Sequence, residues 1–180
     1  MKAKVTLLDE ITLNRAIVRM SHEIIEKNKG IEDVVLVGIR TRGVPMAKRI
    51  GECIKNIEGA ELNIGSIDIT HYRDDRTAFG ERTSVNATEI DFDIHNKNVI
   101  LCDDVLFTGR TARAAIEALL HFGRPKTIQL AVLIDRGHRE LPIRADYVGK
   151  NIPTSLSEQI AVKFLETDGE VGVILCEKAE

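Results

Sequence analysis

Segments of helical and strand-like spacing alternate along the chain. Apolar side chains at Leu13, Ile17, Met20 and Ile24 recur every three or four positions, which predicts an amphipathic helix that ends at Gly30. Further helices are predicted over 44–54 and 111–121, and strands over 34–39, 62–72, 99–102 and 127–134. Strands that alternate with helices predict the α/β class, with a mostly parallel, twisted sheet flanked by helices.

The last part of the chain contains three shorter strand-like runs, at 145–148, 159–165 and 171–176. We expect a small hood here, over the carboxyl ends of the strands, where open α/β sheets bind ligands. The 180 residues contain no linker or repeat, which predicts a single domain over 1–180, with the hood built from about 135–180 plus the N-terminal segment. A polar, charged stretch over about 71–88 predicts a flexible loop.

Composition places the chain among globular proteins of the cytoplasm. Hydrophobic residues make up 43% and charged residues 29%, and no apolar run approaches the roughly 18 residues that span a membrane. The three cysteines form no Cys-x-x-Cys pair, so neither a disulfide framework nor a zinc site is indicated. A net charge of −3 carries no general nucleic-acid signal, so an RNA site would have to be a local basic surface.

Two adjacent carboxylates, Asp103 and Asp104, follow the apolar run that begins at Val99. The loop Thr108-Gly109-Arg110-Thr111 comes next and leads into a predicted helix. Ionised carboxylates accept hydrogen bonds from sugar hydroxyls, whereas unpaired N–H groups and the dipole at a helix N-terminus favour a phosphate. This order of residues predicts a site for a ribose 5-phosphate. The alternative is that these residues only cap a helix, but capping requires neither the second carboxylate nor the whole loop.

A second turn with anion-binding chemistry, Arg40-Thr41-Arg42-Gly43, directly follows the predicted strand over 34–39. Two guanidinium groups beside a glycine can bind a diphosphate through charge-assisted hydrogen bonds. Taken alone, the turn is equally consistent with a solvated basic surface. Its expected place at the same edge of the sheet as Asp103 favours the diphosphate.

Together these segments resemble the signature of type I phosphoribosyltransferases, which bind 5-phosphoribosyl 1-diphosphate (PRPP). The resemblance implies that fold, with Asp103, Asp104 and Arg42 as catalytic residues. It also implies Mg²⁺ as a cofactor held mainly through the substrate rather than by protein ligands. The PRPP- or nucleotide-binding residues that it implies are Thr41, Arg42, Gly43, Asp103, Asp104, Val105, Thr108, Gly109, Arg110 and Thr111.

Phe107 departs from the pattern of the purine-salvage members, which usually carry an Asp at this position. That departure argues against a purine substrate and leaves the site without an obvious general base. A pyrimidine such as uracil has a more acidic ring N–H and requires less help. The residue therefore favours a pyrimidine base.

The run from Leu133 to Ser155, with the first helix and Arg42-Gly43, resembles the bacterial pyrimidine operon attenuation regulators over nearly the whole chain. The stretch after Asp75 departs most. The resemblance implies a homo-oligomer that binds UMP or UTP, then grips a stem-loop in the leader mRNA of the pyrimidine operon and favours termination. It also implies uracil phosphoribosyltransferase activity, with Arg136 and Ile160 contacting the uracil.

The RNA contacts that we expect come from the first helix and from the later segment, and they are Arg19, His22, Lys27, His138, Arg139, Arg144 and Lys150. Acidic residues such as Glu23 and Asp146 lie between them, so composition alone is equally typical of a solvated surface. Structured RNA is recognised by shape and by splayed bases, so a moderate basic patch suffices. A plain pyrimidine-salvage enzyme without an RNA partner remains the alternative.

Overall fold

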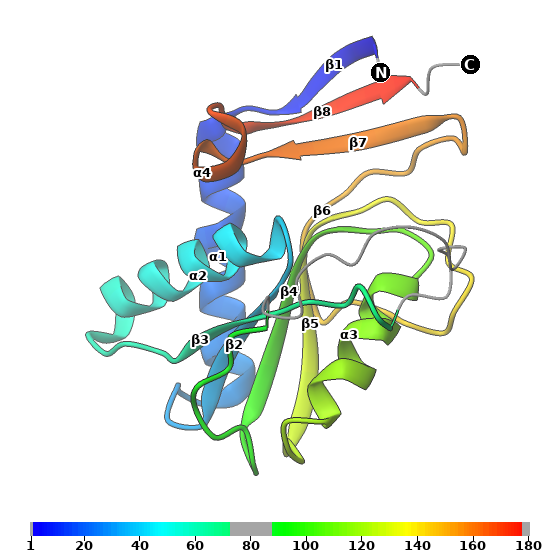
Figure 1. Cartoon of the computed structure of the whole chain (residues 1–180). Coiled ribbons are helices and arrows are strands. Elements are labelled where there is room, and N and C mark those ends of the chain that lie inside the picture. The colour runs from blue at the N-terminus through cyan, green and yellow to red at the C-terminus, as the bar shows by residue number, and fades with distance from the viewer. Residues whose placement is uncertain (1, 73–87, 178–180) are drawn as a thin grey trace.

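The computed structural model describes residues 2–72 and 88–177; the predicted loop over 71–88 therefore lies mostly outside the described residues. Five strands form a parallel sheet in the order β3-β2-β4-β5-β6 (Figure 1). Their bounds are β2 Val34–Ile39, β3 Ile64–Ile67, β4 Asn98–Leu106, β5 Thr127–Asp135 and β6 Tyr147–Asn151. The predicted α/β class with a parallel sheet is confirmed.

Helices cover both faces of this sheet. Since successive residues of a strand point to opposite sides, alternate residues pack against different helices. Leu36 of β2 and Ile100 of β4 pack toward α1 (Glu10–Asn28) and α2 (Gly43–Glu58). The neighbouring residues Val35 and Val37 pack toward α3 (Arg110–Leu120) on the other face. The strands are apolar at consecutive positions because each side of the sheet faces a helix layer.

The ends of the helices follow local chemistry. Asp9 caps α1 by accepting a hydrogen bond from the Thr12 backbone N–H at 2.8 Å, and Lys29 ends the helix in the left-handed conformation. Helix α2 runs to Glu58, one turn beyond the predicted end, because its final carbonyl bond is made by the N–H of Gly59 at a φ of 74°.

A second, antiparallel sheet of three strands lies at the end of the molecule where both termini meet (Figure 1). Its order is β1-β8-β7, with bounds β1 Lys2–Leu8, β7 Glu158–Lys163 and β8 Gly172–Glu177, and the short helix α4 (Leu165–Asp168) joins β7 to β8. This sheet is the small hood. Strand β6 falls within the expected hood range, yet it pairs with β5 in the main sheet, so the hood sheet is narrower than 135–180.

Several predicted strand boundaries are wrong. The runs predicted over 145–148 and 159–165 are β6 and β7 with shifted bounds, and Leu165 belongs to α4 instead. Strand β3 was predicted to run from 62 to 72, but it ends at Ile67 because its partner β2 ends at Ile39. Beyond it, Asp68 turns the chain by accepting from the Thr70 N–H at 2.8 Å. Strand β4 was predicted to end at Cys102, but it continues to Leu106 because β5 pairs with it that far.

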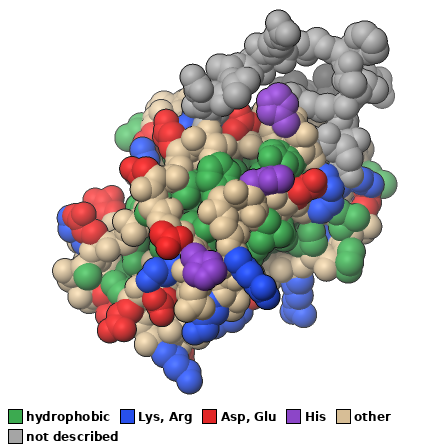
Figure 2. Space-filling model, turned by 60° about the horizontal axis from the view of Figure 1, so that its bottom comes forward, with side chains coloured by type: hydrophobic (Ala, Val, Ile, Leu, Met, Phe, Trp, Pro, Cys, Tyr) green, Lys and Arg blue, Asp and Glu red, His purple; other side chains and the backbone are tan. Residues whose placement is uncertain are grey.

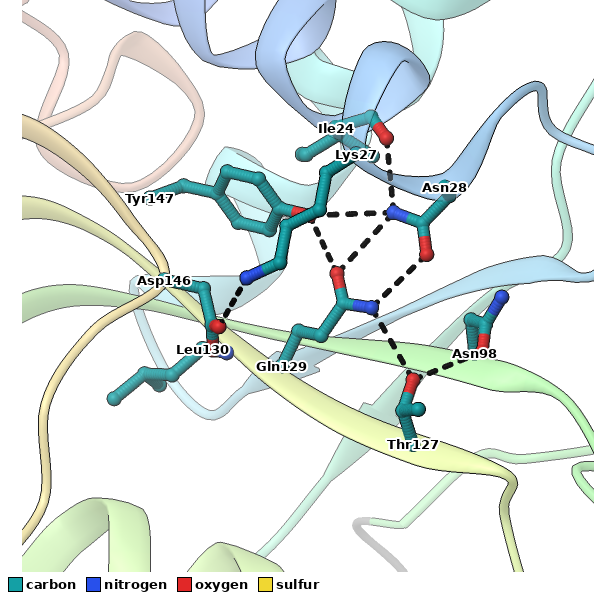
Figure 3. Close-up of polar contacts among 9 residues, drawn as sticks. All are labelled: Ile24, Lys27, Asn28, Asn98, Thr127, Gln129, Leu130, Asp146 and Tyr147. Carbon is teal, nitrogen blue, oxygen red and sulfur yellow. Dashed lines mark hydrogen bonds and ion pairs between the residues drawn. The ribbon is translucent and has the colours of Figure 1, made fainter.

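A buried polar network fixes the C-terminal end of α1 to β5 and β6 (Figure 3). Gln129 of β5 lies at its centre, donating to Asn28 Oδ1 at 2.9 Å and to Thr127 Oγ1 at 3.2 Å. The Tyr147 hydroxyl donates to Gln129 Oε1 at 2.5 Å, and Asn28 Nδ2 also donates to the Ile24 carbonyl at 2.8 Å. Because these buried groups satisfy one another, the network aligns α1 with the sheet.

Candidate active site

The acidic pair lies in the second half of strand β4, near the C-terminal end of the parallel strands. Asp103 is buried, with 9% of its surface exposed, and accepts a hydrogen bond from the Asp104 N–H at 2.9 Å. Asp104 accepts from the Val105 N–H at the same distance. Burial raises the pKa of Asp104, an effect opposed by its hydrogen bond with Val105 and by the charge of Arg42. The strand therefore holds both carboxylates in fixed positions.

The β4–α3 loop borders a hollow of about 360 Å³ beside this pair. Gly109 adopts a φ of 94°, a left-handed conformation that favours glycine, and α3 begins at the next residue. The N-cap residue Gly109 has no side chain, and the N–H of Arg110 donates to the Thr108 hydroxyl at 3.3 Å. The dipole and the first N–H groups of a helix favour an anion at this position. The residues that line the hollow are Asp103, Val105, Leu106, Phe107, Thr108, Gly109, Arg110, Thr111 and Glu140. The predicted phosphate loop is thus adjacent to the acidic pair.

The predicted diphosphate turn packs directly against β4. A Cβ on Gly43 would lie 2.1 Å from the carbonyl oxygen of Cys102, so only glycine permits this approach. The peptide bond between Arg40 and Thr41 is cis, and Thr41 is exposed. Close packing at Gly43 brings the turn to the edge of the sheet that carries Asp103.

The two arginines of this turn have different partners. Arg40 donates to the Ser66 hydroxyl at 3.2 Å and turns toward β3. Arg42 donates from Nη2 to Asp168 Oδ1 of α4 at 2.7 Å, and its Nε is buried without a hydrogen-bond partner among the described residues. The charge of Arg42 also acts on Asp104. Of the two guanidinium groups, that of Arg42 faces the acidic pair and the hood.

Arg136 is buried and is held by the hood. Its guanidinium donates to Thr154 Oγ1 at 2.8 Å and to the carbonyls of Ser155 and Glu158 at 2.9 Å each. It also lies over the Phe107 ring, 4.1 Å from the centroid. Ile160 is partly buried on β7 and packs against the core that includes α1 and α2. Arg136 thus connects the hood to the loop that borders the hollow.

Residues 136–144, here called the cover segment, lie against the β4–α3 loop. The backbone N–H groups of Glu140 and Leu141 both donate to the Thr108 carbonyl, at 2.9 and 3.1 Å. The Arg139 guanidinium donates to the Phe107 carbonyl at 2.6 Å and forms an ion pair with Asp135. Arg139, which is predicted to contact RNA, is half-buried in the structure, and its guanidinium contacts the loop of the site; its role in RNA binding stays a prediction.

The other residues predicted to contact RNA lie in three different environments. Arg19 donates to the carbonyls of Val148 and Gly149, and Lys27 pairs with Asp146 at 2.5 Å, so these side chains of α1 lie beside β6. His22, Arg144 and Lys150 are exposed. His138 contacts the Thr154 carbonyl through Nε2 at 2.5 Å. The structure therefore brings the α1 cations next to the segment that contains Asp146 and Lys150, and contact of these residues with RNA stays a prediction.

Among the described residues, no group of three or more His, Cys, Asp or Glu side chains could hold a metal ion. Asp103 and Asp104 nonetheless offer hard carboxylate oxygens of the kind that Mg²⁺ prefers. The site would be compatible with a Mg²⁺ ion that is held mainly by a phosphorylated substrate, with these carboxylates nearby.

Two residues near the site were missed in the sequence. Asp168 pairs with Arg42, and Glu140 pairs with Arg110 through Nε at 2.7 Å. In each pair the two partners are far apart in sequence, so no local spacing predicts the contact. The alternating charges of the cover segment were the only available sign.

One face of the described surface shows no strong bias toward one charge. On the face seen in Figure 2, cationic and anionic side chains are interspersed, and hydrophobic side chains surface between them. None of the described helices is long and apolar enough to cross a lipid bilayer.

A parallel sheet whose edge carries an acidic pair, an anion-binding loop and a small hood defines a type I phosphoribosyltransferase. The model of the phosphoribosyl transferase domain matches residues 6–165, so the chain belongs to this family. A hypoxanthine-guanine phosphoribosyltransferase from Bacillus anthracis superposes with a TM-score of 0.71 at 21% identity, covering 99% of this chain and 100% of that one. The hypoxanthine phosphoribosyltransferase of Trypanosoma cruzi gives 0.75 at 18% identity, covering 96% and 95%. These likenesses show the shared fold.

Relatives of much higher identity are bifunctional PyrR proteins. The chain is 62% identical to the bifunctional protein PyrR of Caldicellulosiruptor bescii over 169 residues, covering 94% of this chain and 93% of the relative. The PyrR protein of Clostridium novyi is 57% identical over 178 residues, covering 99% and 100%. The family membership predicted from residues 133–155 and the β4–α3 loop is confirmed.

Proposed function

We propose that the protein is a uridine-nucleotide-dependent regulator that binds the leader mRNA of the pyrimidine operon and attenuates its transcription. It also catalyses the transfer of ribose 5-phosphate from PRPP to uracil, giving UMP and diphosphate. The observation that carries the proposal is that Asp103 and the loop from Thr108 to Thr111 line one hollow at the N-terminus of α3. The high identity to bifunctional PyrR proteins supports the pairing of the two activities.

The residues of the site have separable roles in this reaction. Asp103 and Asp104 accept hydrogen bonds from the ribose hydroxyls, while the loop from Thr108 to Thr111 holds the 5-phosphate. Arg42 stabilises the charge of the departing diphosphate as the anomeric carbon develops oxocarbenium character. Mg²⁺, when bound with PRPP, neutralises part of the diphosphate charge. Loss of one well-aimed donor to the diphosphate is expected to reduce the rate about 100-fold.

Phe107 supports a pyrimidine base over a purine. Its ring lies under the guanidinium of Arg136 and 5.8 Å from the ring of His138, so an apolar surface stands where purine-salvage members carry a proton acceptor. A base with an acidic ring N–H reacts with less assistance. Uracil fits this requirement better than hypoxanthine.

The RNA surface combines α1 and the segment beside it. Arg19 and Lys27 lie next to β6, the exposed Arg144 precedes this strand, and the exposed Lys150 lies within it. Cations from two segments at one surface provide phosphate contacts, and exposed polar side chains such as His22 provide contacts to RNA bases. We propose that the protein acts in the cytoplasm as a homo-oligomer.

Two measurements test the function. Purified protein is incubated with PRPP, Mg²⁺ and either uracil or hypoxanthine; we expect UMP to form and hypoxanthine to remain unused. Filter binding of a pyrimidine-operon leader transcript is then measured with and without UMP, and we expect tighter retention with UMP. Catalysis without nucleotide-dependent RNA retention would leave only a salvage enzyme, and efficient turnover of hypoxanthine would contradict the role given to Phe107.

A further inference from the structure

Several hydrogen bonds join the cover segment to the β4–α3 loop close to Glu140. The backbone N–H groups of Glu140 and Leu141 donate to the Thr108 carbonyl, and the Arg139 guanidinium donates to the carbonyl of the neighbouring Phe107. These bonds set the backbone of Glu140 at the rim of the hollow. The backbone position of Glu140, and with it the reach of its side chain, is therefore imposed by the fold.

The carboxylate of Glu140 lines the hollow and accepts a hydrogen bond from Arg110 Nε at 2.7 Å. The side chains of Arg110 and Glu140 are 36% and 53% exposed, so both can move without disturbing the core. The carboxylate of Glu140 opposes binding of a phosphate because it occupies the guanidinium of Arg110 that a phosphate would otherwise bind. Nothing in the fold requires an acid here, because the backbone of Glu140 makes the structural contact.

We propose that Glu140 competes with the 5-phosphate of the ligand for Arg110 and so determines the affinity of the hollow for phosphorylated ligands. The inference rests on the proposed function of the site as a nucleotide pocket. Because Glu140 belongs to the cover segment, a phosphate that takes Arg110 releases a side chain of the segment that carries His138 and Arg144. Ligand binding is thereby communicated to residues predicted to contact RNA.

The experiment compares UMP binding by isothermal titration calorimetry for wild type, Glu140→Gln and the control Glu117→Gln. Glu117 pairs with Arg113 on the same helix as Arg110 at 2.9 Å, and it is 51% exposed. The control therefore removes a similar charge from a similar ion pair, away from the lining of the hollow. Glu140→Gln is expected to bind UMP about fivefold more tightly, in line with exposed ion pairs, and Glu117→Gln as wild type does. Uridine, which lacks the phosphate, is expected to bind all three equally.

Two further measurements isolate the competition for Arg110. The gain from Glu140→Gln should shrink as ionic strength rises from about 0.05 to 0.5 M, because screening weakens an exposed ion pair. It should also disappear in an Arg110→Gln background, where there is no guanidinium to release. A purely structural role for Glu140 would change neither the salt dependence nor this double-mutant cycle.

The outcomes separate this inference from the function beneath it. If wild type binds UMP and Glu140→Gln binds it no more tightly, or if Glu117→Gln gains equally, the competition is wrong. If the gain persists in the Arg110→Gln background, Glu140 does not act through Arg110 and the inference is also wrong. If wild type binds no UMP, the proposed function fails, and the same series titrated with inorganic phosphate still decides the role of Glu140.

Discussion

The guanidinium of Arg42 donates to the carboxylate of Asp168 at 2.7 Å, which joins the predicted diphosphate turn to the hood. Asp168 is itself held by the Phe164 N–H at 3.1 Å and by the Thr167 hydroxyl at 2.8 Å. The hydrogen bond from Arg42 lowers the pKa of Asp168 to about 2. Arg42, next to the main sheet, is therefore oriented by Asp168 of α4, the short helix that joins β7 to β8 in the second sheet.

Asp168→Asn is expected to lower the free energy of unfolding by about 1 kcal/mol at pH 7, after allowance for solvent screening of the partly exposed pair. Because the folded-state pKa is depressed, the stabilisation is present above the unfolded pKa near 3.8 and is lost as pH falls toward 2. Urea unfolding at pH 7, 4 and 3 measures the difference. Glu166→Gln, which breaks the pair with Arg49 on the same short helix, is the control. A difference that does not change with pH would contradict the titration of Asp168.

Asp104→Asn is expected to weaken UMP and PRPP binding together, by tenfold or more, because hydrogen bonds to a charged partner are lost. Burial raises the pKa of Asp104, so its charged form destabilises the folded state at neutral pH. Since an amide can still accept from Val105, the variant should be at least as stable as wild type. Calorimetric titration and thermal unfolding measure the two effects. Unchanged nucleotide affinity would argue against a role in binding the ribose hydroxyls.

Arg139→Gln and Arg144→Gln are expected to differ, although both residues were predicted to contact RNA. Arg139 supports the Phe107 carbonyl, so its loss should reduce uracil transfer as well as RNA binding. The exposed Arg144 should affect RNA alone, with a salt slope smaller by about one. Filter binding across salt concentrations and the uracil assay separate them. Normal transfer in Arg139→Gln would place that side chain on the RNA surface, as the sequence first suggested.

Tyr147→Phe is expected to cost about 1 kcal/mol, because Gln129 loses a buried donor. Burial raises the pKa of Tyr147 to about 12, whereas the unfolded chain releases this proton near 10. The unfolded state therefore binds fewer protons between these values, and stability falls as pH rises through this range. Urea unfolding at pH 8 and 11 should show this alkaline loss in wild type and less of it in the variant. Tyr72→Phe provides the matched control, and an equal loss in both variants would exclude Tyr147 as the source.

The sequence was most informative where neighbours along the chain form the structure. The 3.6-residue spacing from Leu13 to Ile24 predicted α1, and the order of carboxylates, loop and helix over 103–111 predicted the hollow. Strand boundaries were less accurate because pairing partners decide them. Strand β3 ends where β2 ends, and β4 extends as far as β5 accompanies it. Strand β1 was not predicted, since its pairing with β8 joins the two ends of the chain.

The chain by itself thus determined the class of fold and the order of acidic pair, loop and helix that line the hollow, because each depends on residues that lie within one strand, turn or helix start. Only the tertiary structure decided which partner each charged side chain meets. It turned Arg139 toward Phe107, placed Asp168 against Arg42, and set Glu140 beside Arg110. A long charged side chain pairs with whatever the fold brings within about 4 Å, and that distance has no counterpart in sequence spacing.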